Sequence, residues 1–142
     1  MPEPIFVDTW GWIALGQHRD PRHPRVKRLY QELHKAGGVF YTSDYILDEV
    51  ATLLFRREVF LEAVRFMEGI FESAQQRLLM IERITSDRFA AAWSLRKHFQ
   101  DKPRISFTDL TSMALMQELG VTRILTEDEH FLQVGLGFQR VP

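Results

Sequence analysis

The sequence of 142 residues contains no cysteine. This absence excludes disulfide bonds, thiolate nucleophiles and metal sites with cysteine ligands, and it is compatible with a reducing compartment. The chain also lacks any apolar run near the ~20 residues of a membrane-spanning helix. Its first residues show neither the basic start nor the long apolar segment of a secretory signal. We therefore expect a cytoplasmic protein that has no contact with a membrane.

An excess of charge of one sign is lacking as well, since 18 Lys and Arg oppose 19 Asp and Glu for a formal net charge of −1. A nucleic-acid partner would have to be held by local basic patches rather than by the field of the whole protein. Apolar residues make up 45% of the chain and aromatic residues 12%, which is enough for a folded core. We expect one domain that spans residues 1–142.

Short apolar segments alternate with helical patterns along the chain. Strands are expected at residues 5–7, 39–41, 78–81, 123–125 and 138–141, with intervening helices that include residues 10–15 and 108–119. Helix N-caps are assigned to Thr9, to Ser43 or Asp44, and to Ser86. This alternation predicts an α/β fold, a three-layer α/β/α sandwich around a central, mainly parallel sheet of about five short strands.

Four acidic residues stand where a carboxylate has little structural reason to be. Asp8 and Asp128 each follow a short strand, so they are expected at the carboxyl edge of the sheet, where parallel α/β sheets bind ligands. Glu49 lies on an otherwise apolar helix face, and Asp109 lies in the first turn of a helix. Gathered in one pocket, the four carboxylates would repel one another unless a cation lay among them, and Mg²⁺ prefers oxygen ligands. The pattern indicates a divalent-metal site.

Each of these acids also has an ordinary explanation. Carboxylates often begin turns after strands, lie at the boundary of a core or stabilise a helix N-terminus. Thr9 could orient the carboxylate of Asp8 by a hydrogen bond. His130, beside Phe131, is more typical of a hydrogen-bonded structural group than of a metal ligand.

Basic residues are concentrated in two segments. The first includes Arg19, Arg22 and Arg25, and the second includes Lys102 and Arg104. Taken singly, such side chains usually belong to the solvated surface. Either segment could also bind the phosphates of a nucleic acid beside an acidic centre that would otherwise repel it.

Short motifs surround the four acids: Phe6-Val7-Asp8-Thr9, Ser43 with Ile46-Leu47 and Glu49, Ser106-Phe107-Thr108-Asp109, and residues 126–131. Their order and spacing resemble the PIN-domain nucleases, and particularly the VapC-like toxins of type II toxin–antitoxin pairs. The resemblance spans nearly the whole chain. Trp10 departs from it, because smaller or polar residues are more usual at that position.

The resemblance implies a ribonuclease that depends on Mg²⁺ or Mn²⁺ and hydrolyses RNA phosphodiester bonds with an activated water. Its carboxylates would be Asp8 and Asp109 as direct ligands, with Glu49 and Asp128 as ligands or water-orienting groups. The resemblance also matches small hydroxyl residues that would support them, Thr9, Thr108 and Thr126. It further implies a homodimer and a small antitoxin protein as a partner.

Two alternative interpretations compete with this one. A haloacid-dehalogenase-like phosphatase also ends its first strand with an aspartate, but it requires a second acid two residues later, where this chain has Trp10. A PIN fold could also be an RNA-binding or protein-binding module without catalysis. The complete set of four acids favours the nuclease.

Overall fold

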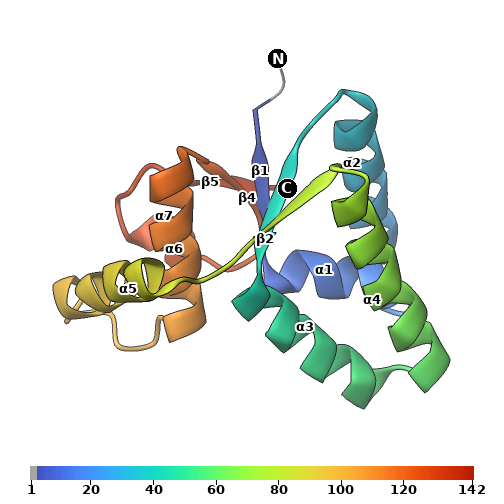
Figure 1. Cartoon of the computed structure of the whole chain (residues 1–142), viewed down its shortest axis with the longest axis horizontal. Helices are drawn as coiled ribbons and strands as arrows, with labels where there is room; N and C mark the ends of the chain where they lie inside the picture. Colours follow the sequence, from blue (N-terminus) through green and yellow to red (C-terminus); the bar gives the residue numbers. More distant parts are fainter. Residues whose placement is uncertain (1–2) are drawn as a thin grey trace.

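The computed structural model describes residues 3–142, and its centre is a single sheet of five strands (Figure 1). The strands are β1 (Ile5–Val7), β2 (Phe40–Ser43), β3 (Leu79–Glu82), β4 (Arg123–Leu125) and β5 (Gln139–Val141). They lie in the order β3-β2-β1-β4-β5, and every neighbouring pair is parallel. The predicted sheet is confirmed, with strand ends shifted by one or two residues.

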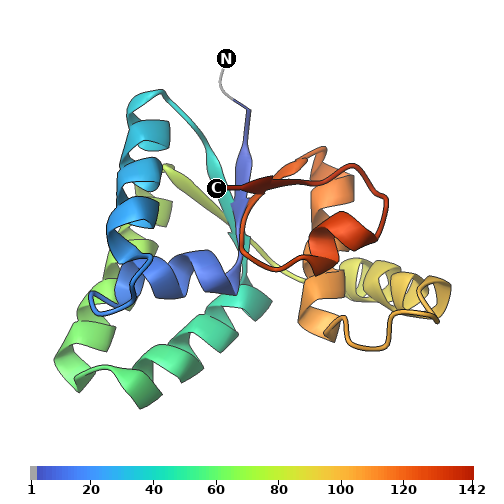
Figure 2. The same ribbon diagram turned by 180° about the vertical axis from the view of Figure 1, so that it is seen from behind.

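Helices cover both faces of the sheet, which confirms the predicted sandwich. They are α1 (Thr9–Gly16), α2 (His23–Lys35), α3 (Asp44–Arg57), α4 (Phe60–Gln75), α5 (Ser86–His98), α6 (Phe107–Leu119) and α7 (His130–Gln133). Helices α1, α2 and α4 lie on one side of the sheet and α5, α6 and α7 on the other, as the two opposite views show (Figures 1 and 2). Helix α3 contacts both α1 and α6. The four-residue helix α7 was not predicted.

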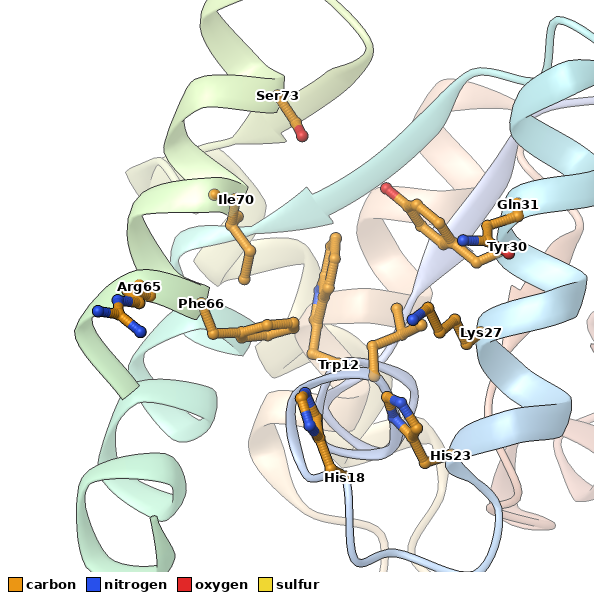
Figure 3. A pocket seen from close by; sticks show the side chains of 12 residues that line it. Trp12, His18, His23, Lys27, Tyr30, Gln31, Arg65, Phe66, Ile70 and Ser73 are labelled. Carbon is orange, nitrogen blue, oxygen red and sulfur yellow. The ribbon is translucent and has the colours of Figure 1, made fainter. Parts of the chain in front are cut away.

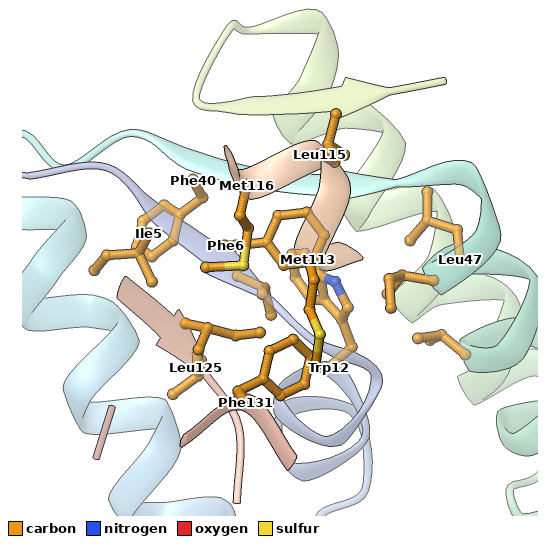
Figure 4. Close-up of a cluster of buried hydrophobic side chains, with 14 of the residues drawn as sticks. Ile5, Phe6, Trp12, Phe40, Leu47, Met113, Leu115, Met116, Leu125 and Phe131 are labelled. Atoms are coloured by element: carbon orange, nitrogen blue, oxygen red, sulfur yellow. The ribbon is translucent and has the colours of Figure 1, made fainter. Parts of the chain in front are cut away.

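Both β1 and α6 contribute continuously buried segments to the core. Every residue of β1 is buried, and α6 is buried without interruption from Leu110 to Met116. Side chains of β1, β4, α1 and α6 belong to one cluster, in which Phe6, Met113 and Leu125 take part (Figure 4). Burying each large side chain of this kind contributes ~1.5–3 kcal/mol. The two elements that carry Asp8 and Asp109 are therefore among the most firmly packed.

Two helix starts test the predicted caps. The hydroxyl of Ser43 accepts a hydrogen bond from the Ile46 backbone N–H at 3.1 Å, so Ser43 caps α3 as expected. The prediction for α5 is wrong by one residue, because the side chain of Thr85, rather than Ser86, accepts from the backbone N–H of Arg88. Ser86 is already helical, and an N-cap residue needs extended backbone dihedrals, which Thr85 has.

The order of strands reverses beside β1. The chain moves from β1 to β2 and β3 on one side, and then to β4 and β5 on the other. Helix α1 packs against the carboxyl end of β4 at Gly11, where an added Cβ would lie 3.0 Å from the Leu125 carbonyl oxygen. The carboxyl ends of β1 and β4 and the start of α1 thus meet at the position where sheets of this topology bind ligands. In residues 3–142 no helix is long and apolar enough to cross a membrane.

Candidate active site

The four predicted acids line one cavity of about 620 Å³. Asp8 directly follows β1, Glu49 lies in α3, Asp109 lies in the first turn of α6, and Asp128 follows β4. Four separate parts of the sequence therefore contribute one carboxylate each to the same space.

Asp8 and Asp128 are connected through Thr126, which is fully buried. The Thr126 hydroxyl donates to Oδ2 of Asp8 at 2.7 Å, and its oxygen accepts from the backbone N–H of Asp128 at 3.0 Å. Oδ1 of Asp128 accepts from the backbone N–H of His130 at 2.8 Å. These bonds fix the orientation of both carboxylates and leave Oδ1 of Asp8 available to a ligand.

The hydroxyl of Thr9 has a different partner from the one that the sequence predicts. It does not cap α1 and donates to Oε1 of Glu49 at 2.7 Å, whereas the backbone N–H of Thr9 bonds the carboxylate of Asp8. The reason is that α3 passes close to the start of α1, so a carboxylate 40 residues away is within reach. Thr9 therefore orients the acid that the sequence left without a partner.

Asp109 is held by its helix. Its backbone N–H donates to the Ser106 hydroxyl at 3.0 Å, which caps α6, and its side chain turns into the cavity. Thr108 makes no hydrogen bond to these carboxylates in the described part of the chain; its carbonyl accepts from Thr111 at 2.6 Å. Successive residues of a helix point in different directions, which separates Thr108 from the acid beside it.

His130 belongs to this site, although its sequence context favoured a structural role. Its Nδ1 lies 3.2 Å from Oδ1 of Asp128 and 3.6 Å from Oδ2 of Asp109. One ligand atom from each of these three residues lies within 4.8 Å of the others, a spacing that could hold a metal ion. His130 reaches the site because it begins α7, a one-turn helix that is too short to produce a recognisable sequence pattern.

The four carboxylates place several negative charges close together in a partly apolar cavity. Burial, with smaller contributions from the charges of Asp128 and Glu49, raises the pKa of Asp8 to about 6 against the lowering effect of the Thr126 bond. Burial and the charges of Asp8 and Asp128 raise the pKa of Asp109 to about 8. A cation among these oxygens would reverse both shifts. Carboxylate oxygens are the donors that Mg²⁺ and Mn²⁺ prefer, so the four acids fit either ion.

The predicted basic residues lie at different distances from the acids. Arg22 and Arg104 line the acidic cavity itself. Arg25 and Lys102 line two adjoining cavities, which share other residues with it, and Arg19 is exposed in the segment between α1 and α2. The structure thus brings only part of the predicted basic set to the acids.

Arg57 was missed by the sequence analysis. It lines the acidic cavity and lies two helical turns after Glu49, so the spacing i, i+4, i+8 through Leu53 was the signal that could have identified it. Arg96 donates to the carbonyl oxygens of residues 99, 102 and 105 at 2.7–2.8 Å. It thereby fixes the segment between α5 and α6 that carries Arg104.

A second cavity of about 400 Å³ lies between α1, α2 and α4 and shares no lining residue with the acidic one. Trp12, Phe66 and Ile70 form its apolar part, as Figure 3 shows. Around it lie basic side chains and two imidazoles, namely those of His18, His23, Lys27 and Arg65. The lining of this cavity combines apolar and basic side chains, as in a binding groove, and includes no carboxylate.

A family model described as PIN domain matches residues 5–136. The chain belongs to the PIN-domain family. A relative named 23S rRNA-specific endonuclease VapC20, from two strains of Mycobacterium tuberculosis, is 34% identical to this PIN domain over 137 residues, which cover 92% of the chain and 94% of the relative. A crystal structure of Mycobacterium tuberculosis VapC20, described as a toxin that cleaves the sarcin–ricin loop, matches with a TM-score of 0.75 and 33% identity. That match covers 92% of this chain and 95% of the other.

These similarities make this PIN domain a VapC-like nuclease, an enzyme that hydrolyses phosphodiester bonds. The predicted resemblance is confirmed. The haloacid-dehalogenase alternative is wrong, because the family and the fold both differ from it.

We predict that the metal-free PIN domain loses stability as the pH rises from about 4, where an unfolded aspartate titrates, towards about 8, the pKa of Asp109. The folded state keeps its protons in this range while the unfolded chain releases them, so the free energy of unfolding falls with increasing pH. Asp8→Asn removes one of the repelling charges and should raise the melting temperature at pH 8. Circular dichroism in EDTA measures both effects.

Asp48→Asn is the matched control, since Asp48 is exposed on the same helix as Glu49. A wild-type melting temperature that rises steadily between pH 5 and pH 8, or an Asp8→Asn protein that melts below the control at pH 8, would contradict the prediction.

Proposed function

We propose that this PIN domain is an endoribonuclease that depends on Mg²⁺ or Mn²⁺ and is the toxin of a toxin–antitoxin pair. The observation that carries the proposal is the convergence of Asp8, Glu49, Asp109 and Asp128 in one cavity, with the pKa values of two of them raised. The similarity to proteins named as an rRNA endonuclease and as a toxin that cleaves the sarcin–ricin loop supports structured RNA as the substrate class.

Asp8 and Asp109 would hold the ion directly, because they are the more buried of the acids and carry the raised pKa values. When bound, Mg²⁺ or Mn²⁺ supplies positive charge against the scissile phosphate and lowers the pKa of a water molecule. One carboxylate oxygen of Glu49 accepts the hydrogen bond from the Thr9 hydroxyl, and the other can orient that water molecule. Asp128 can do the same from the end of β4, where two hydrogen bonds fix its position: its backbone N–H donates to the Thr126 hydroxyl, and its Oδ1 accepts from the backbone N–H of His130.

Arginines around the acids would bind the phosphates of the substrate. Arg22, Arg57 and Arg104 reach the cavity from three different segments, so positive charge surrounds the carboxylates. This arrangement lets a protein with a net charge of −1 bind a polyanion locally. Lys102 and Arg25 extend the positive surface on either side, and we expect Arg19 to contribute least because it lies outside these cavities.

We predict that the purified protein cleaves structured RNA only with Mg²⁺ or Mn²⁺. Asp8→Asn and Asp109→Asn should each lower kcat by more than ~100-fold, beyond the loss typical of a residue that only supports a metal ligand. Gel-based cleavage assays on an RNA panel that includes a sarcin–ricin stem-loop measure this effect, with Asp48→Asn as the control of unchanged activity. Cleavage in EDTA, or full activity of both variants, would contradict the proposal; RNA binding without any cleavage would favour the non-catalytic alternative.

The cavity between α1, α2 and α4 is the place that we propose for the antitoxin. An apolar floor surrounded by Lys27, Arg65 and two imidazoles suits a peptide segment that combines apolar and acidic side chains.

We predict that Lys27→Glu combined with Arg65→Glu weakens the complex with the small protein encoded by the neighbouring reading frame by at least ~10-fold, since like charges then oppose each other. Both side chains are exposed, so folding should be retained, and RNA cleavage by the free protein should not change. Isothermal titration calorimetry measures the affinity. Arg83→Glu, an exposed residue outside this cavity, is the control, and equal affinities of control and double variant would contradict the assignment.

The turn between α3 and α4 is the surface that we propose for a homodimer. Val59, Phe60 and Leu61 are each more than half exposed there, and the ring of Phe55 packs against that of Phe60 at 5.3 Å. Exposed apolar groups that gather in this way commonly mark an interface.

We predict that Phe60→Ser with Leu61→Ser converts a dimer to a monomer in size-exclusion chromatography with light scattering. Phe89→Ser, which changes an exposed ring on α5, should leave a dimer; a monomeric wild type would contradict the proposal.

A further inference from the structure

A narrower cavity of about 220 Å³ adjoins the acidic one and is lined by three arginines. Arg22 and Arg25 come from the start of α2, and Arg140 comes from β5. Trp10, Arg22 and Glu127 line both cavities, so Trp10 and Arg22 stand at the boundary between them. We call this space the arginine cavity.

Several contacts fix the positions of the side chains at the boundary between the two cavities. The guanidinium carbon of Arg22 lies 5.7 Å from the centroid of the Trp10 ring, and Nε of Arg22 lies 2.9 Å from Oε2 of Glu127. Arg140 donates to the backbone carbonyl of the same Glu127 at 3.2 Å. The indole Nε1 of Trp10 is buried and has no hydrogen-bond partner among the described residues. A buried donor of this kind is stabilised when a ligand supplies an acceptor.

The charge of the arginine cavity is not fully compensated by the protein. Arg22 forms ion pairs with Glu127 and, at 3.9 Å, with Asp20, whereas neither Arg25 nor Arg140 forms an ion pair with any residue between 3 and 142. The lining itself has three guanidinium groups and one acidic side chain, so Arg25 and Arg140 are available to an anionic ligand. Planar guanidinium groups bind phosphate with two parallel hydrogen bonds, which suits such a narrow space.

We propose that the arginine cavity binds a backbone phosphate of the RNA strand, next along the strand to the phosphate that the acids hydrolyse. This inference rests on the function proposed above. Trp10 and Arg22 then lie beside the nucleotide that links the two phosphates, and Arg25 and Arg140 hold its far end. The departure from the family pattern at Trp10 forms the wall between the two positions.

The test uses the double variant Arg25→Gln with Arg140→Gln, because both side chains are exposed and their loss should not disturb folding. Fluorescence anisotropy measures the Kd for a stem-loop RNA in EDTA, where binding is separated from cleavage. We expect the Kd to rise at least ~10-fold and the slope of log Kd against log salt to fall by about 0.7, the value for one released phosphate contact on a single strand. Arg25→Lys with Arg140→Lys keeps the charges and should restore the salt slope, but only part of the affinity, because an ammonium group cannot form the two parallel hydrogen bonds.

The matched control is Arg28→Gln with Lys35→Gln, which removes the same two charges from the exposed surface of α2 outside the arginine cavity. A Kd and a salt slope of the first double variant equal to those of this control would overturn the inference. An effect limited to RNA with a 5′-phosphate would also overturn it, because the cavity would then hold a terminal group. Cleavage is scored separately in Mg²⁺: an inactive wild type refutes the proposed function, whereas the Kd comparison still decides the role of the arginine cavity.

Discussion

Repulsion among carboxylates is the constraint on which the organisation of this protein depends. Four acids share one cavity, and burial of Asp8 and Asp109 makes their charged forms costly. The fold tolerates this arrangement because both residues adjoin buried backbone: Asp8 follows β1, which is entirely buried, and Asp109 precedes the buried stretch of α6 from Leu110 to Met116. Hydroxyl donors then fix the carboxylates from outside, with Thr126 on Asp8 and Thr9 on Glu49.

The strand and helix pattern could be predicted because it is local. Short apolar segments at the strand positions and the apolar periodicity of α6 follow from the sequence alone, and strand ends in a parallel sheet share one edge, which placed Asp8 beside Asp128. The cap of α5 was misplaced by one residue, since Ser86 and Thr85 are chemically alike and only the backbone dihedrals distinguish them. Helix α7 has a single turn and therefore no period to detect.

Parts of the site that depend on tertiary approach could not be predicted. Thr9 finds Glu49 because two helices converge, and His130 joins Asp109 through a turn that brings distant segments together. The basic residues show the same limit. Sequence neighbours suggested Arg19 and Lys102, whereas the residues that line the acidic and arginine cavities also include Arg57 and Arg140, which come from α3 and β5. Basic residues that are far apart in the sequence form one positive surface only after the chain has folded.

The position of Arg140 determines how easily it can be substituted. It lies on β5, an edge strand that pairs only with β4, and its side chain is exposed, so its replacement costs little folding stability. Asp8 follows the central strand and is only 5% exposed, so few substitutions there are compatible with the fold. The edge of the sheet can therefore accept changes of side chain that its centre cannot. An RNA contact at Arg140, as proposed above, would be the part of the site that a substitution alters at the lowest cost in folding stability.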